Sequence, residues 1–158
     1  MSPDRPILLG ADDAGLDLLD VIARDLVDLG VAVEVVRPAD IGPEEIDYPD
    51  VAERVALAIH DGRSDRGILI CGTGIGMAIT ANKVPGVRAA LAHDVYSAER
   101  ARKSNNAQIL TLGARVIGPE SAKTVVRAWL ASEFAGGAST RKVDKIDALE
   151  RRLAATDD

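Results

Sequence analysis

Short apolar runs alternate along this chain with longer stretches whose apolar residues recur at helical spacing. Several of the runs are bounded by Gly. Such an alternation is typical of a parallel sheet whose strands are buried beneath covering helices. We therefore predict a doubly wound, Rossmann-like α/β fold with a five-stranded parallel sheet and helices on both faces. The predicted strands are Ile7–Gly10, Val31–Val36, Gly67–Cys71, Val87–Ala92 and Gln108–Gly113.

The stretches between these runs predict helices with one apolar face each. Pro49 and Pro119 stand where a helix can begin, and Gly30 stands where the first helix would end. A helical segment over Met77–Lys83 would follow the third strand. The expected inward residues are Leu19, Ile22, Leu26 and Leu29 in the first helix, Val51, Ala52, Val55 and Ile59 in the second, and Ala122, Val125, Val126, Trp129 and Leu130 after Pro119.

A last helix is expected to begin near Arg141. Its apolar residues form a narrow stripe flanked by charge, which suits packing on a partner subunit as well as on its own core. We expect this C-terminal helix to pack on a partner subunit, and only Ala154–Asp158 to form a frayed tail. The stripe consists of Val143, Ile146, Leu149 and Leu153.

Length and composition narrow the class of protein. The chain has 158 residues, of which 47% are hydrophobic and 28% are charged, so we expect residues 1–158 to form one domain. A single Cys allows no intrachain disulfide and favours a reducing compartment. No segment resembles a signal peptide or a membrane span, so a cytoplasmic protein without a membrane partner is expected. A net charge of -6 with scattered basic residues argues against nucleic-acid binding and leaves a small anionic ligand open.

Two loops at the predicted carboxyl edge of the sheet carry unusual chemistry. Ligands of doubly wound sheets bind beyond this edge, near the point where the winding reverses. The loops are Gly10–Gly15 and Cys71–Gly76, and three alternating glycines in the second would let backbone N–H groups face an anion. An ordinary strand-to-helix turn is the alternative. A dinucleotide fingerprint is rejected, because the third glycine is Gly76 and the loop does not follow the first strand.

Cys71 stands at the rim of this predicted anion site. Neighbouring amides favour an anion, and therefore the thiolate, which can act as a base. A single Cys after an apolar run is otherwise more often a small buried hydrophobic residue. Its position beside the glycines favours the base.

One long segment makes the sequence recognisable. Residues 67–90 read GILICGTGIGMAITANKVPGVRAA. They closely resemble the ribose-5-phosphate isomerase B family, which also includes galactose-6-phosphate isomerase subunits. Similar segments are 47–50 (DYPD), 93–98 (HDVYSA), 112–119 (LGARVIGP) and the Gly136–Gly137 turn, so the resemblance covers nearly the whole chain.

The resemblance implies an aldose–ketose isomerase that needs no metal or other cofactor. Family members move a proton between C1 and C2 through a cis-enediolate, and Cys71 is implied to be the base. The amides of Gly72–Gly76 would stabilise the developing oxyanion, with help from the Thr73 hydroxyl. Some members carry a Glu base at the position of Met77, which cannot accept a proton, so Cys71 is left alone in this role.

The resemblance also implies how substrate is bound. Asp12 would bind substrate hydroxyls, whereas Asn105 and Arg115 would reach the Cys71 loop of a neighbouring subunit, with Arg115 on the phosphate. The enzyme would then be a homodimer, or a dimer of dimers, with shared active sites. The plainer alternatives are a helix N-cap for Asp12, a helix C-terminal residue for Asn105 and a solvated charge for Arg115. The predicted substrate-binding residues are Asp12, Asp13, Tyr48, Gly72, Gly74, Ile75, Gly76, Ser104, Asn105, Arg115, Arg141 and Lys142.

Several positions depart from the family pattern. Asp13 and Ser104 stand where ribose-5-phosphate isomerases of this type usually carry histidines, so the histidine that opens the sugar ring is missing. Ala138–Ser139 replaces an Arg–His pair, and Lys142, next to Arg141, replaces a later Arg. The phosphate contacts are therefore expected to be rearranged or lost.

The missing histidine favours a substrate that cannot close a ring. In a tetrose 4-phosphate, the hydroxyl that would close a five-membered ring carries the phosphate, so the sugar stays open. We therefore expect an isomerase that converts D-erythrulose 4-phosphate to D-erythrose 4-phosphate. Two alternatives stay open: a ribose-5-phosphate isomerase in which another group opens the ring, and a sugar-phosphate-binding protein without catalytic activity.

The sequence contains two histidines. His60 ends the second predicted helix, where a cation interacts well with the helix dipole, and is expected to be structural. His93 follows the fourth strand, nearer to the ligand edge. It is expected to support the residues that contact the ligand, or to replace the missing acid.

Overall fold

Five parallel strands form one sheet in the computed structural model, which describes residues 5–155. The strands are β1 (Ile7–Ala11), β2 (Val33–Val36), β3 (Gly67–Cys71), β4 (Ala89–Leu91) and β5 (Ile109–Gly113). Their spatial order is β2-β1-β3-β5-β4. The predicted five-stranded parallel sheet is confirmed.

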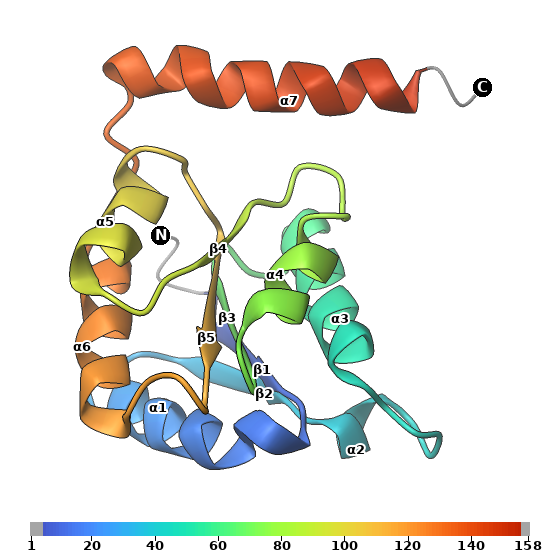
Figure 1. Ribbon diagram of the computed structural model, residues 1–158, viewed down its shortest axis with the longest axis vertical. Coiled ribbons are helices and arrows are strands. Elements are labelled where there is room, and N and C mark those ends of the chain that lie inside the picture. Colours follow the sequence, from blue (N-terminus) through green and yellow to red (C-terminus); the bar gives the residue numbers. More distant parts are fainter. Residues whose placement is uncertain (1–4, 156–158) are drawn as a thin grey trace.

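Helices cover both faces of the sheet, as predicted (Figure 1). On one face lie α1 (Leu16–Asp28), α5 (Val95–Lys103) and α6 (Pro119–Leu130), whose buried side chains share a core with Leu9, Ile70 and Leu110. On the other face, α3 (Tyr48–His60) and α4 (Ile75–Ala81) pack over Leu8 and Leu69. The shorter elements are α2 (Pro38–Ile41) and the 3-10 turns η1 (Asp13–Gly15) and η2 (Gly137–Ser139).

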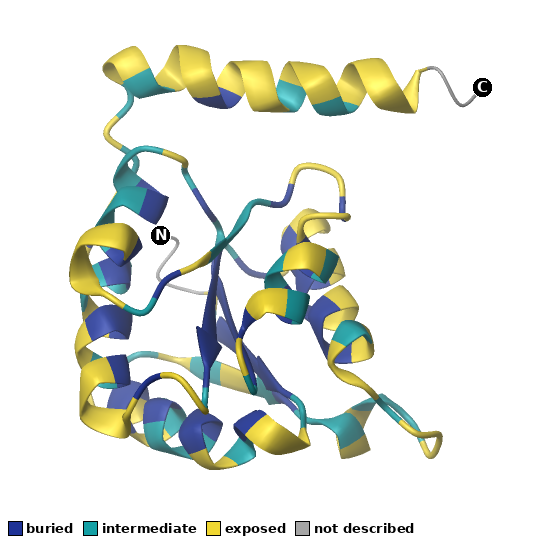
Figure 2. Cartoon of the chain, viewed as in Figure 1, coloured by how far each residue is buried: buried dark blue, intermediate teal, exposed yellow. Residues whose placement is uncertain are grey.

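The central strands explain the apolar runs in the sequence. Every residue of β1, β3 and β5 is buried, because helices cover both of their faces (Figure 2). Successive side chains point to opposite faces of a strand, so each run supplies both cores at once. Burial of one Leu or Ile side chain stabilises the fold by roughly 1.5–3 kcal/mol.

Three strands begin later than predicted: β5 begins at Ile109 and not at Gln108, and β2 and β4 each begin two residues late. The amides of Val31 and Val87 donate to the carbonyls of Leu26 and Val84, at 2.9 and 3.1 Å, and so join the preceding turn and not the sheet. The predicted Val31–Val36 and Val87–Ala92 therefore shorten to β2 and β4.

Three helical predictions also need correction. The amide of Ala78 donates to the carbonyl of Gly74, so α4 begins at Ile75 and not at Met77, and it ends at Ala81 and not at Lys83. Leu29 was expected to face inward but is 56% exposed, because α1 ends at Asp28 and Gly30 turns the chain away with φ +76°. The predicted inward residues of α6 are buried except for Leu130, which is half-buried at the end of the helix.

The C-terminal helix α7 (Thr140–Ala154) lies across the amino edge of the sheet, apart from the two helical layers (Figure 1). Val143 is its buried residue, whereas Ile146 and Leu149 of the same stripe are 47% and 46% exposed. Asp147 pairs with Arg88 at 2.9 Å near the start of β4. Packing of this stripe on a partner subunit stays a prediction.

Among the helices of residues 5–155, none is long and apolar enough to span a membrane.

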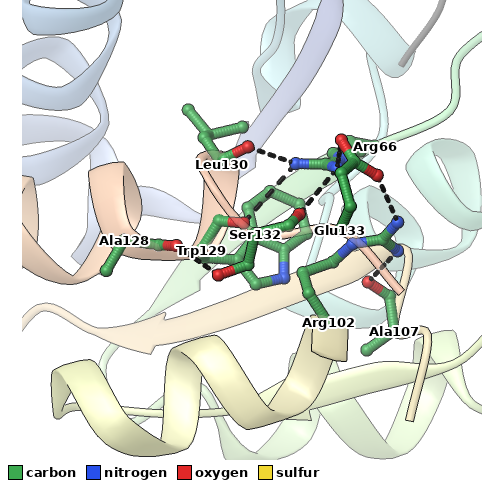
Figure 3. Close-up of polar contacts among 8 residues, drawn as sticks. All are labelled: Arg66, Arg102, Ala107, Ala128, Trp129, Leu130, Ser132 and Glu133. Atoms are coloured by element: carbon green, nitrogen blue, oxygen red, sulfur yellow. Dashed lines mark hydrogen bonds and ion pairs between the residues drawn. The ribbon is translucent and has the colours of Figure 1, made fainter. Parts of the chain in front are cut away.

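A buried arginine ties the start of β3 to the end of α6 (Figure 3). Arg66 is 1% exposed and donates to the carbonyls of Leu130 and Ser132 at 2.7 and 2.9 Å. The last carbonyls of a helix have no intrahelical donor, and the guanidinium satisfies them here. It also lies 5.4 Å from the centroid of the Trp129 ring and pairs with Glu133 at 2.6 Å.

Replacing this arginine should weaken the fold. Arg66→Met keeps much of the buried volume but leaves carbonyls of α6 without a donor, and should lower the free energy of unfolding by about 2–4 kcal/mol. Arg5→Met is the matched control, because Arg5 pairs with Asp65 at the surface with 44% of its side chain exposed, and should change stability by less than about 1 kcal/mol. Urea unfolding at one fixed protein concentration measures both. Equal losses in the two variants would contradict the anchoring role of Arg66.

Candidate active site

The winding of the sheet reverses between β1 and β3. These strands are neighbours. From β1 the chain continues to β2 on one side, and from β3 it continues to β4 on the other side. Ligands bind beyond the carboxyl edge at such a point. A cleft of about 420 Å³ opens there, lined by Asp12, Tyr48, Cys71, Gly72, Thr73, Ile75, Gly76, Ile79 and Arg115.

The glycine loop after β3 places a backbone amide against the sulfur of Cys71. Gly74 has φ +78°, and a Cβ there would lie 2.8 Å from the carbonyl carbon of Leu112, so both conformation and space require glycine. The Gly74 amide donates to Cys71 Sγ at 3.0 Å. A backbone donor therefore faces the sulfur where Cys71 borders the cleft. The Thr73 hydroxyl accepts from the Ile75 amide at 3.3 Å at the start of α4.

The turn after β5 holds this loop from the other side. The amides of Ala114 and Arg115 donate to the carbonyls of Cys71 and Gly72 at 2.8 and 3.0 Å. This pairing places the Arg115 side chain in the same cleft as Cys71. The expectation that Arg115 reaches the Cys71 loop of a neighbouring subunit is therefore wrong. The backbone bond to Gly72 fixes residue 115 beside the cleft of its own chain.

Asp12 follows β1 and lines the cleft, and its carboxylate also accepts from the Gly15 amide at 3.1 Å. Asp12 therefore caps the turn η1, as the N-cap alternative predicted, and also lines the cleft. Burial raises the pKa of this carboxyl above its ordinary value of 3.8, although the amide bond opposes the shift. Asp13 is exposed in η1 and is not among the residues that line the cleft.

Tyr48 and α4 form another wall. Tyr48 is the first residue of α3, and its ring lies so close to Gly76 that a Cβ on Gly76 would come within 2.3 Å of it. Ile79 is a lining residue that the sequence analysis missed. It follows Ile75 by four residues, and this spacing places both side chains on one face of a helix.

The remaining predicted residues lie elsewhere in the chain. Asn105 precedes β5, whereas Cys71 pairs with Gly113 at the far end of that strand. The strand itself spans about 13 Å from Ile109 to Gly113 at the usual rise per residue. Ser104 lies beside Asn105, and Arg141 and Lys142 are exposed at the start of α7, at the same amino edge (Figure 1). One chain therefore does not bring these residues to its own cleft.

Three further residues have clear places. Met77 is fully buried in the core beneath α4. His60 ends α3, and its Nδ1 lies 2.8 Å from the carbonyl oxygen of Pro85, as a structural residue would. His93 accepts from the Gly113 amide at Nε2, at 2.8 Å, and is not among the lining residues. Its imidazole is therefore bonded to the backbone of Gly113.

Within residues 5–155, no group of three or more His, Cys, Asp or Glu side chains could hold a metal ion.

Comparisons with known proteins point to one family of isomerases. The family model described as Ribose/Galactose Isomerase matches residues 7–146. A D-erythrulose-4-phosphate isomerase of Pectobacterium atrosepticum is 56% identical over 92% of this chain and 95% of its own length. A ribose-5-P isomerase B of Listeria innocua is 48% identical over 92% of this chain and 97% of its own length. The solved ribose-5-phosphate isomerase B of Clostridium thermocellum superposes with a TM-score of 0.86 at 43% identity, covering 94% and 99% of the two chains.

The position of Asp12 predicts how it affects stability. Because burial raises its pKa in the folded chain, the ionised carboxylate opposes folding, and this effect grows as pH rises through and above 3.8. Asp12→Asn should therefore increase the free energy of unfolding at neutral pH, since Asn caps a helix as well as Asp does. The gain should disappear below that pH, where the carboxyl is protonated in both states.

Asp17→Asn is the matched control for this prediction. Asp17 lies in the first turn of α1, where negative charge favours the helix, so its removal should give no gain at neutral pH. Thermal unfolding of both variants across the acidic and neutral range measures the difference. A loss of stability in Asp12→Asn at neutral pH would contradict the expected sign.

Proposed function

Because this chain belongs to the ribose/galactose isomerase family, we propose that it converts D-erythrulose 4-phosphate to D-erythrose 4-phosphate. Membership makes it a sugar-phosphate isomerase acting between ketose and aldose, and the tetrulose substrate is the finer proposal. One observation carries it: Cys71 lines the cleft, but neither of the two histidines of the sequence does.

A cleft without a histidine suits an open-chain sugar. A pentose 5-phosphate closes to a furanose through its C4 hydroxyl, so its isomerase needs an acid or base that opens the ring. In a tetrose 4-phosphate that oxygen carries the phosphate, and the carbonyl is already free. Asp13 and Ser104, which stand where histidines are usual in the family, would not be needed for such a substrate.

The lining residues can divide the reaction between them. The Cys71 thiolate would take a proton from C1 of the ketose and return it to C2, while a hydroxyl proton moves from O1 to O2. Amides of Gly72–Gly76 would stabilise the enediolate oxygens, as the Gly74 amide already faces the sulfur. The Arg115 guanidinium offers charge and several donors for the phosphate, and Asp12 offers an acceptor for substrate hydroxyls.

We further propose that two chains complete each site. Asn105 lies at the amino edge of the sheet, so it can reach a Cys71 loop only in another subunit. The exposed Ile146 and Leu149 of α7 offer an apolar face for the contact. A homodimer, or a dimer of dimers, accommodates both the position of Asn105 and the apolar face of α7. Each chain, residues 1–158, would be one cytoplasmic isomerase domain. No nucleic-acid or membrane partner enters this proposal.

The principal alternative is a ribose-5-phosphate isomerase, which the similarity to the Listeria innocua protein supports. Because positions 13 and 104 carry no histidine, a different group would then have to open the sugar ring. A sugar-phosphate-binding protein without catalytic activity is less favoured, because Cys71 and its amide donor are both in place.

Substrate preference tests the proposal directly. We expect kcat/KM for D-erythrulose 4-phosphate to exceed that for ribulose 5-phosphate and ribose 5-phosphate on the same preparation. Cys71→Ser should lower kcat by about 10²–10⁴-fold and change KM little, because a hydroxyl keeps the shape but supplies almost no anion. A preference for ribose 5-phosphate would overturn the tetrulose proposal, and near-normal turnover in Cys71→Ser would remove Cys71 from the base role.

Subunit mixing tests the shared site. Cys71→Ala and Asn105→Ala should each be inactive, but their mixture should regain part of the activity, because some clefts then receive an intact Cys71 and an intact Asn105. Cys71→Ala mixed with Arg115→Ala is the matched control. Both of those residues lie in the cleft of one chain, so no mixed site carries the two intact groups. Inactivity of the first mixture despite demonstrated subunit exchange would contradict the shared site.

A further inference from the structure

At the carboxyl end of the β4–β5 pairing, a histidine side chain takes the hydrogen bond that a further residue of β4 would otherwise accept. Ile109 donates to the carbonyl of Arg88, and Ala92 donates to that of Thr111, in the regular alternation of parallel strands. β4 stops at Leu91, whereas β5 continues to Gly113. The Gly113 amide lies beyond the paired region, and His93 Nε2 accepts its hydrogen bond at 2.8 Å.

The direction of this bond defines the state of the imidazole. A backbone N–H can only donate, so Nε2 must be unprotonated. The ring is therefore neutral and carries its proton on Nδ1. A protonated imidazole has no acceptor and would release the Gly113 amide.

Gly113 is the residue against which the catalytic loop packs. It pairs with Cys71 at the end of β3, and a Cβ at Gly113 would lie 2.7 Å from the backbone of Thr73. The next two amides, of Ala114 and Arg115, hold the carbonyls of Cys71 and Gly72. A shift of Gly113 would therefore be transmitted to the thiol, to the loop amides and to Arg115 together.

We propose that His93 is a positioning residue for the isomerase reaction, holding Gly113 through its neutral imidazole and thereby the Cys71 loop in its working geometry. The inference rests on the proposed function for its effect on turnover, whereas the hydrogen bond itself does not. Protonation of His93 would release Gly113 and lower kcat, although His93 never touches the substrate.

The surrounding charges belong to three elements. Asp94 adjoins the imidazole and interacts electrostatically with it, while its carboxylate accepts from the Ser97 amide at the start of α5. From β3, the Cys71 thiol lies across from Gly113, and Arg115 follows in the turn after β5. The Asp94 carboxyl and the Cys71 thiol can change their own charge with pH. The pH profile of the wild type must therefore be compared with that of the variants and not interpreted alone.

Two substitutions at His93 separate the acceptor from the side-chain volume. His93→Gln places an amide oxygen near the position of Nε2 and does not titrate, so it should keep kcat close to the wild-type value. His93→Leu removes the acceptor and should lower kcat on the order of tenfold, with KM changed much less. The loss of activity that protonation of His93 causes at low pH should be present in the wild type and absent in His93→Gln.

His60→Gln is the matched control, because it removes the other histidine of the chain and should leave kcat and its pH profile unchanged. The same variant makes His93 the single imidazole, so its nitrogen NMR signals need no further assignment. We expect Nε2 without a proton and Nδ1 with one at neutral pH.

Three results would overturn the inference: a proton on Nε2, equal activity losses in His93→Gln and His93→Leu, or an unchanged acidic limb in His93→Gln. Failure of the proposed function is a different result. A wild-type enzyme that prefers a pentose phosphate leaves each of these comparisons intact with that substrate, and the NMR spectrum decides the hydrogen bond without any substrate.

Discussion

The pairing of β3 with β5 is the constraint on which the site depends. Five residue pairs align the two strands, and the last pair joins Cys71 to Gly113. Beyond it, the amides of the β5 turn take the carbonyls of Cys71 and Gly72, so the loop cannot move independently of β5. The thiol, the loop amides and Arg115 are consequently positioned by one backbone network. A proton transfer needs such positioning, because its rate depends steeply on geometry.

The opposite end of β3 is fixed by a different interaction. Arg66 joins the amino end of this strand to the carbonyls that end α6 and to the Trp129 ring. Burial lowers the pKa of the neighbouring Arg102, and Glu133 provides a carboxylate near both guanidiniums. With all five residues of β3 buried, the strand is held at both ends and on both faces. The Cys71 loop therefore extends from a strand that is fixed at both ends.

The two edges of the sheet divide the predicted site residues. The cleft, with Asp12, Cys71 and Arg115, lies at the carboxyl edge, whereas Asn105 and α7 lie at the amino edge. A site shared between chains would bring the two edges together. The sequence departures from the family pattern occur at both edges, at Asp13 near the cleft and at Ser104 on the far side, which is the distribution expected if one substrate contacts both chains.

The sequence by itself determined the sheet, the covering helices and the glycine loop that follows Cys71, and it predicted Cys71 as the base. These features depend on local patterns: the period of apolar residues, and glycines where the backbone needs left-handed angles or close approach, as at Gly74. Strand ends were less predictable, because the amides of Val31 and Val87 bond to preceding turns and not to the sheet. Only the tertiary structure placed Arg115 in the cleft of its own chain and His93 on the Gly113 amide. Both depend on the insertion of β5 between β3 and β4, and strand order and register arise from long-range packing that no local pattern encodes.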